Sequence, residues 1–182
     1  MKVAVIGLGK SHDGAPWADP GWQKWGLPWD AYAPRCNLLF EMHPLELVLR
    51  DEADRGGAAY LARLKEQCCA IMMRERHEAI RASVAYPLRS VIADVGDYFG
   101  SSPAYMVALA ICERAEEIGL WGVDIGEKYD HQRPNLEYLI GFARGRGIKV
   151  TVAGGSLLTL RKHDSIGRLS VIYPRRYGDL AG

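Results

Sequence analysis

The alternation of short apolar runs with helix-like segments constrains the fold of this chain more than any other feature. Apolar, largely β-branched runs occur at Val3–Ile6, Ile118–Val123 and Ile148–Val152, and a helical pattern at Asn135–Arg144 separates the last two. Continuous rather than alternating apolar runs are typical of strands buried on both faces of a parallel sheet. Strands that alternate with helices indicate an α/β fold.

Weaker signals extend the same pattern along the chain. Beyond Gly154 the periodicity is lost, which predicts an irregular C-terminal tail or arm. We therefore expect a Rossmann-like, mostly parallel sheet flanked by helices in residues 1–153, followed by a tail in residues 154–182. The further strands are expected at 23–26, 37–40 and 69–73, and the further helices at 45–50, 58–67, 87–95 and 102–116.

Composition excludes several classes of protein. The chain has 182 residues, a hydrophobic content of 48% and a net charge of +1, which fits one globular domain and argues against a general nucleic-acid binder. It shows no signal peptide and no apolar run of membrane-spanning length, so a cytoplasmic protein without membrane contact is expected. The four cysteines form no CxxC pair, which argues against a zinc site and indicates reduced thiols.

A glycine loop follows the first expected strand. Residues Ala4–Ser11 formally match a phosphate-binding P-loop, but Ala4 lies inside the strand and no helix directly follows Ser11. A dinucleotide fingerprint is also incomplete, since the third glycine is missing. The interpretation that remains is a nucleotide-binding loop at Gly7, Gly9 and Ser11, with a simple tight turn as the alternative. Four nearby tryptophans either clamp a base or pack a proline-rich loop onto the body.

The segment Gly100–Pro103 predicts an anion site. A Ser-Pro pair, Ser102 as N-cap and Pro103 at the first helical position, is typical of a helix start. Exposed amides and the helix dipole favour a phosphate there, so Ser101 and Ser102 are candidate nucleotide-binding residues. An ordinary cap without a ligand is the alternative.

A polar loop follows the strand that ends at Val123. Asp124 should lie at the edge of the sheet where ligands dock, and it suits a ribose hydroxyl or a metal. Tyr129 and Arg133 could neutralise a leaving phosphate, and His131 could act as a general base. Alternatively the loop holds Mg²⁺ through the carboxylates of Asp124, Glu127 and Asp130, or is merely solvated.

Three segments carry a family resemblance: SSPAYMVALAI, AEEIGLWGVDIG and NLEYLIGFARGRGIKV. They resemble the core of the bacterial CMP-sialic-acid-dependent sialyltransferases. They are also similar to a wider Rossmann-like group, often of phage origin, that includes relatives of archaeal 6-hydroxymethylpterin pyrophosphokinase. The resemblance implies that Ser101 and Ser102 lie at the nucleotide phosphate, that Gly7 and Gly9 belong to the first glycine loop, and that Asp124 lies beside the nucleotide.

The chain also departs from that pattern. Ile125 and Gly126 replace the tyrosine that follows the aspartate in the family, with Tyr129 as the candidate substitute. The catalytic histidine of the sialyltransferases has no counterpart in register, and His131 is the nearest one. We expect a nucleotide-dependent transferase, with glycosyl transfer from a nucleotide sugar favoured and with Tyr129, His131 and Arg133 handling the leaving group and the acceptor.

Two other functions stay open. One is an Mg²⁺-dependent transfer of the pyrophosphokinase type, and Mg²⁺ is the one cofactor considered. The other is a non-catalytic nucleotide-binding protein, such as a phage accessory factor. The expected partner is a nucleotide or a nucleotide sugar, and assembly into a homo-oligomer is left open.

Overall fold

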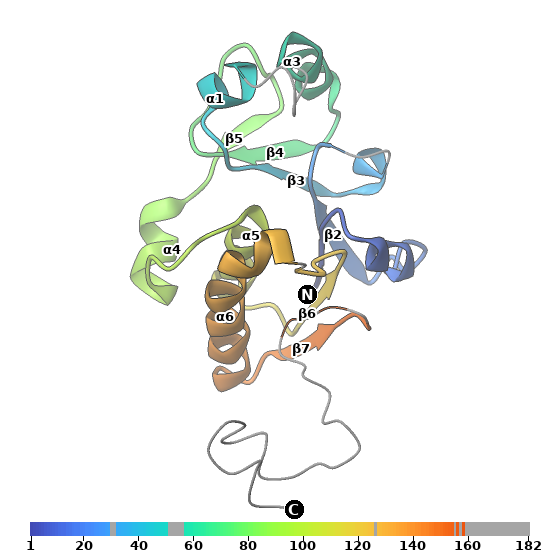
Figure 1. The fold of residues 1–182 in the computed structure, drawn as a ribbon, viewed down its shortest axis with the longest axis vertical. Coiled ribbons are helices and arrows are strands. Elements are labelled where there is room, and N and C mark those ends of the chain that lie inside the picture. Colours follow the sequence, from blue (N-terminus) through green and yellow to red (C-terminus); the bar gives the residue numbers. More distant parts are fainter. Residues whose placement is uncertain (30–31, 51–56, 126, 155, 157, 159–182) are drawn as a thin grey trace, which may run out of the picture.

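The computed structural model describes residues 1–29, 32–50, 57–125, 127–154, 156 and 158, and these build one seven-stranded sheet (Figure 1). All described strand pairs are parallel, in the order β5-β4-β3-β2-β1-β6-β7. The expected α/β fold with a parallel sheet is confirmed. The strands are β1 (Lys2–Ile6), β2 (Trp22–Gly26), β3 (Leu38–Glu41), β4 (Ala70–Met73), β5 (Ser83–Ala85), β6 (Glu117–Trp121) and β7 (Lys149–Val152).

Helices cover both faces of the sheet. Val3 and Val5 of β1 point into a core shared with α4, α5 and α6, whereas Ala4 and Ile6 point into a second core shared with α1 and α3. Successive side chains of a strand point to opposite faces of the sheet, so one strand contributes to both cores. The helices are α1 (Leu45–Arg50), α3 (Gly57–Glu66), α4 (Leu88–Val95), α5 (Ser102–Cys112) and α6 (Arg133–Gly145), with 3₁₀ turns η1 (Lys10–Gly14), η2 (Ala33–Arg35) and η3 (Glu127–Gln132).

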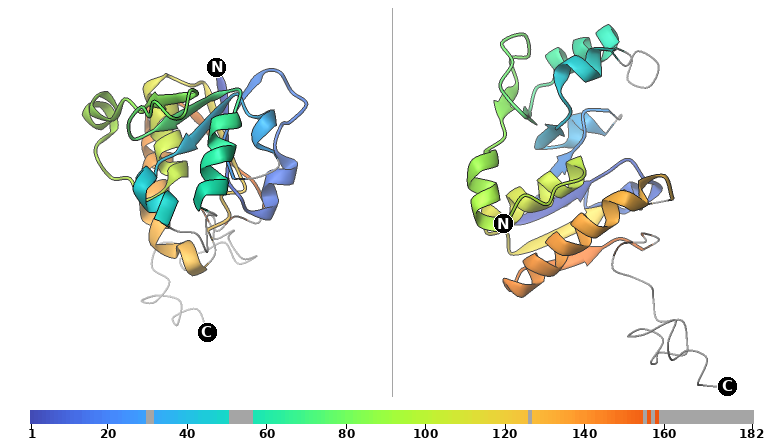
Figure 2. Two further views of the ribbon diagram at one scale, coloured as in Figure 1. Left: turned by 90° about the horizontal axis from the view of Figure 1, so that it is seen from above. Right: turned by 60° about the vertical axis from the view of Figure 1, so that its left-hand side comes forward.

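Helix α5 lies at the centre of the molecule. It is apolar nearly all round and packs against β1, α4 and α6, and Figures 1 and 2 show α5 and α6 side by side. The helix ends at Cys112, so the expected end near Glu116 is wrong. Arg114 takes a left-handed backbone conformation, with φ of 55°, which turns the chain toward β6 before a further helical turn can form.

The tryptophans of the proline-rich segment pack within the chain. Each makes a ring contact with another aromatic side chain, and Trp29 stacks on Tyr60 with ring centroids 4.2 Å apart. This agrees with the packing interpretation. The other pairs are Trp17–Tyr32, Trp22–Trp121 and Trp25–Phe40.

The start of the expected tail contacts the domain. Ser156 and Leu158 are buried, and the Ser156 hydroxyl donates a hydrogen bond to the carbonyl of Val123 at 2.7 Å. The rest of the expected irregular tail, residues 159–182, lies outside the described residues.

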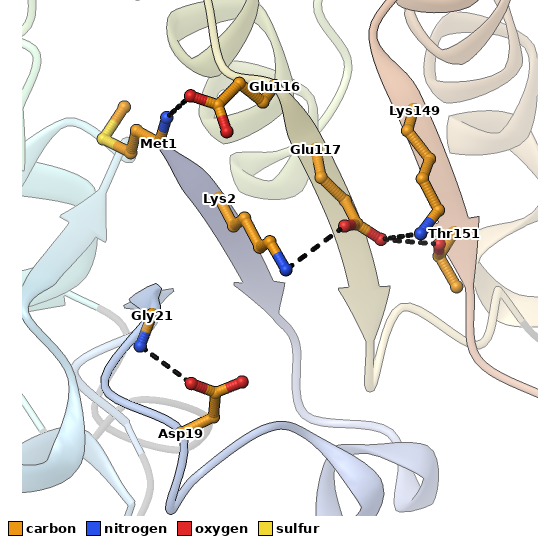
Figure 3. A network of polar contacts seen from close by, with 8 residues as sticks. All are labelled: Met1, Lys2, Asp19, Gly21, Glu116, Glu117, Lys149 and Thr151. Atoms are coloured by element: carbon orange, nitrogen blue, oxygen red, sulfur yellow. Dashed lines mark hydrogen bonds and ion pairs between the residues drawn. The ribbon is translucent and has the colours of Figure 1, made fainter.

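A polar network joins the starts of β1, β6 and β7 (Figure 3). Glu117 lies between Lys149 and Lys2, with nitrogen–oxygen distances of 2.9 and 3.8 Å, and accepts a hydrogen bond from Thr151 at 3.4 Å. Because Glu117 is largely buried, these cations offset the cost of removing its charge from water. The amino edge of the sheet is therefore fixed by side-chain pairing.

The opposite, carboxyl edge holds the switch point of the topology. The chain proceeds outward from β1 to β5 and then returns to place β6 on the other side of β1. Ligands of open α/β sheets bind outside the carboxyl ends of the strands, where the winding reverses. In this chain that point lies between the loop after β1 and the loop after β6.

Candidate functional site

The loops after β1 and β6 are joined by a serine–aspartate contact. The hydroxyl of Ser11 donates to the carboxylate of Asp124 and accepts a hydrogen bond from the amide of Gly122 at 2.7 Å. The Ser11 amide also donates to Asp124 at 3.2 Å. Two of the predicted nucleotide-binding residues thus lie together at the switch point, where they hold the two loops against each other.

The bare backbone of Gly7 and Gly9 serves this loop contact. A Cβ on Gly7 would collide with the carbonyl of Gly122, and one on Gly9 with the carboxylate of Asp124. Gly122 itself has φ of 66°, a conformation that favours glycine. Close packing of the two loops therefore accounts for these glycines in the structure, and the prediction that Gly7 and Gly9 approach a nucleotide stays a prediction.

Helix α5 begins one residue earlier than expected. Ser101, not Ser102, is the N-cap: it has extended backbone angles, and its hydroxyl accepts a hydrogen bond from the Ala104 amide at 3.3 Å. Pro103 therefore occupies the second helical position, and the expected cap at Ser102 is wrong. The Ser102 hydroxyl has no hydrogen-bond partner among the described residues.

The start of α6 lies against the start of α5. A Cβ on Gly100 would collide with the side-chain amide of Asn135, so these two segments touch. Because α5 leads into β6 and α6 leads into β7, both helices have their N-termini at the carboxyl edge of the sheet. Two positive helix ends converge there, which favours an anion.

Two buried polar atoms at the start of α6 lack partners among the described residues. They are Nε of Arg133 and Oδ1 of Asn135, and Asn135 is 5% exposed. Buried polar atoms are normally hydrogen-bonded, so such a pair indicates a place for a ligand or water. Arg133 was predicted as a site residue, whereas Asn135 was missed because its burial depends on Gly100, far away in the sequence.

The predicted catalytic residues lie on η3 and the first turn of α6. Tyr129 is 47% exposed, His131 is exposed, and Arg133 forms an ion pair with Asp130 at 2.7 Å. The structure thus places these three side chains on one short segment that leads into the α6 start.

A second group of polar residues lies at the carboxyl end of β3. Glu41 is 1% exposed and accepts hydrogen bonds from the His43 amide at 3.0 Å, from His43 Nδ1 at 2.6 Å, and from the Tyr60 hydroxyl. Burial alone would raise the pKa of Glu41, but the hydrogen bonds from His43 and Tyr60 hold that pKa below its ordinary value. This group was not predicted from the sequence. Its one local signal is the pair Glu41 and His43, which directly follows the apolar run at residues 37–40.

His43 also lines a cavity of about 300 Å³. The remaining lining residues come from the start of α1 and from the loop after β4, and they carry both signs of charge. They are Pro44, Leu45, Glu46, Arg74, Glu75 and His77.

The described carboxylates do not assemble an Mg²⁺ site. Asp124 accepts hydrogen bonds from Ser11, and Asp130 pairs with Arg133. Among the described residues, no group of three His, Cys, Asp or Glu side chains could hold a metal ion. The third carboxylate of the Mg²⁺ alternative, that of Glu127, lies outside the described side chains, so this alternative stays a prediction.

The four cysteines are free but unequally buried. Cys36 is buried, Cys68 is exposed, and the other two are half-buried. Burial raises the pKa of Cys36 to about 12, so its thiol is unreactive at neutral pH. The structure therefore agrees with the expected reduced thiols, and one of the four is buried.

No protein-family model and no curated protein matches the sequence. Solved structures do match its fold, and they include structures of the sialyltransferase CstII from Campylobacter jejuni. The CstII complex with the substrate analogue cytidine-5'-monophosphate gives a TM-score of 0.57 at 17% identity, and the match covers 86% of this chain and 81% of that one.

Two further CstII structures give the same picture. The complex with CMP-3FNeuAc has a TM-score of 0.54 at 16% identity and covers 84% of this chain and 79% of that chain. A point mutant described as an alpha-2,3/8-sialyltransferase has a TM-score of 0.55 at 17% identity, with coverages of 86% and 83%. At these identities the likeness shows a shared fold.

The sequence resemblance to sialyltransferases is thereby confirmed at the level of the fold. The CstII matches do not support the pyrophosphokinase relatives or a phage origin. Within the described part of the chain, no helix combines the length and the apolar character needed to cross a bilayer.

Proposed function

We propose that the protein is a glycosyltransferase that uses a CMP-linked sugar as donor. In this reaction the bond between the anomeric carbon and the phosphate oxygen breaks, the nucleotide leaves as CMP, and the anomeric carbon forms a bond to an acceptor oxygen. The fold shared with a transferase that was solved with CMP and with a CMP-sugar analogue supports this choice of donor.

One observation carries the proposal: two helix N-termini converge at the carboxyl edge beside the buried Nε of Arg133, a donor that lacks a partner among the described residues. The Nε–H of Arg133 would donate to the phosphate, while the amide and hydroxyl of Ser102 would approach it from α5. The hydroxyl of Ser101 accepts from Ala104 and still has its own hydrogen to donate. A phosphate would satisfy these donors together.

Asp124 would accept a hydroxyl of the ribose. Each carboxylate oxygen can accept more than one hydrogen bond, so the bonds from Ser11 leave acceptor capacity on the same group. Ser11, with Gly7 and Gly9, would then keep the loop after β1 beside the nucleotide.

Tyr129, His131 and Arg133 would handle the leaving group. Arg133 is the best of these three candidates for binding the leaving phosphate, because a guanidinium group can bind phosphate oxygens with two parallel N–H groups. The ion pair with Asp130 already orients this side chain. Tyr129 and His131 are exposed on the adjoining turn and could close over a bound donor. Charge that develops on the departing phosphate would be stabilised by these donors.

The test is release of CMP from CMP-N-acetylneuraminic acid, measured with lactose as a hydroxyl acceptor and with water alone. We expect turnover that persists in EDTA and falls by about 100-fold in Arg133→Ala. A parallel reaction with ATP and Mg²⁺ serves as the comparison. Turnover only with ATP and Mg²⁺ would favour pyrophosphoryl transfer, and tight CMP binding without any turnover would favour a binding protein.

A further inference from the structure

We infer that His43, positioned by Glu41, is the general base that takes the proton from the acceptor hydroxyl, and that the cavity beside it binds an uncharged, hydroxyl-rich acceptor such as a sugar. This inference rests on the proposed function, because it assigns the acceptor half of the same reaction. It concerns residues outside the donor site described above.

The contact with Glu41 fixes the tautomer and the orientation of the His43 ring. A carboxylate only accepts hydrogen bonds, so the 2.6 Å contact places the ring hydrogen on Nδ1. Nε2 of the neutral ring then carries a lone pair, as a base requires. The backbone bond from His43 and the bond from Tyr60 hold the carboxylate still, so the ring orientation is set by a fully buried group.

The cavity suits a neutral polar molecule. His43 is 44% exposed and lines the cavity, which is large enough for a small sugar at about 300 Å³. The lining combines Arg74 and His77 with Glu46 and Glu75, so donors and acceptors are both available. A phosphate or carboxylate would meet two acidic side chains there, whereas hydroxyl groups can pair with either sign.

The position of His43 relative to the donor loops fits a shared reaction centre. β3 is separated from β1 by β2 alone, and neighbouring strands lie about 4.8 Å apart, so the axes of β1 and β3 are about 10 Å apart. Both strands end at the carboxyl edge of the sheet. Helix α5, whose start would bind the donor phosphate, also contacts β3, the strand that leads to Glu41 and His43.

The other described histidines lack such an arrangement. His12 Nδ1 donates to the Gly9 carbonyl at 2.8 Å, and its Nε2 lies 3.3 Å from the exposed carboxylate of Asp13. His131 is exposed, and His77 lines the same cavity but bonds to Ser83 through its backbone, so neither ring contacts a buried carboxylate among the described residues. In the part of the chain that the structure describes, His43 is the ring that a buried acid orients beside a cavity.

The step balances without a further reactant. Nε2 of His43 takes the proton of the acceptor hydroxyl as the acceptor oxygen forms a bond to the anomeric carbon. The electron pair of the broken bond leaves on the phosphate of CMP, and the proton passes from His43 to solvent after release. Glu41 touches neither substrate and acts as a positioning residue.

The experiment compares His43→Ala, Glu41→Gln and the wild type in the CMP-release assay with lactose. We expect His43→Ala to lower kcat by about 100-fold or more while the Kd for CMP, measured by calorimetry, stays within about twofold. Added imidazole should restore part of the His43→Ala rate and leave the wild-type rate unchanged, an effect that a purely structural role would not give. Glu41→Gln should lower kcat and leave KM for the donor unchanged.

Glu66→Gln on the exposed end of α3 is the matched control for Glu41→Gln, and His43→Gln replaces His43→Ala if that variant fails to fold. Wild-type rates in folded His43 variants, or a lowered rate that imidazole does not restore, would overturn the inference and leave the proposed function intact. A wild-type chain that releases no CMP would overturn both.

Discussion

At the scale of single residues, Glu41 links stability to pH. Its pKa is below the ordinary value of 4.5 because hydrogen bonds from His43 and Tyr60 outweigh the effect of burial. A carboxyl group whose pKa is lower in the folded state stabilises the fold above about pH 4.5, and this stabilisation is lost as pH falls through the folded-state pKa.

We therefore expect Glu41→Gln to cost about 1–3 kcal/mol at pH 7, because the donors on His43 and Tyr60 lose a charged acceptor. The difference in unfolding free energy between wild type and variant should shrink as the pH falls below about 4.5, and urea titrations at several pH values below and above it measure this change. A difference that stays constant over that range would contradict the role given to the ionised carboxylate.

Residue identity alone did not reveal this group. Tyr60 lies 19 positions from Glu41 in the sequence. The two side chains meet only because α3 packs against the sheet in the same core as β3. Asn135 was likewise missed, since its contact with Gly100 joins two helix starts. Asp124, by contrast, follows a local signal, an apolar run, and the start of α5 could be predicted to within one residue, with Ser102 in place of Ser101 as the cap.

At the scale of elements, the contact between the loops after β1 and β6 depends on Ser11. Its hydroxyl serves both Asp124 and Gly122, so Ser11→Ala should cost about 1–2 kcal/mol and lower Tm by roughly 2–8 °C. Differential scanning calorimetry measures this change. Ser90→Ala is the matched control, because its hydroxyl bonds only to Pro87 on an exposed helix and should change stability by less than about 0.5 kcal/mol. Equal effects of the two substitutions would argue against a loop-joining role.

Elements with strong local patterns could be predicted, and those that depend on distant pairing could not. β1 and β6 are continuous apolar runs, and α5 has a Ser-Pro start, so their existence follows from local sequence. β5 has three residues, of which Val84 and Ala85 are exposed, so no apolar run marks it. It forms because its backbone pairs with β4, which is a property of the folded sheet.

At the scale of the whole molecule, the two edges of the sheet have different roles. The amino edge is fixed by the network around Glu117 (Figure 3). The carboxyl edge carries the glycine loop, the starts of α5 and α6, and the cavity beside His43. Substrate binding is therefore proposed at the carboxyl edge, where the described chain leaves the buried Nε of Arg133 without a partner.

The central claim is that a phosphate group is bound where the starts of α5 and α6 meet. Calorimetric titration of the wild type with CMP and with cytidine tests it most directly, because the two ligands differ only in the phosphate. We predict that CMP binds at least tenfold more tightly, about 1.4 kcal/mol, and that Arg133→Gln lowers CMP affinity toward that of cytidine. Equal affinities of CMP and cytidine for the wild type, or no binding of either, would contradict the claim.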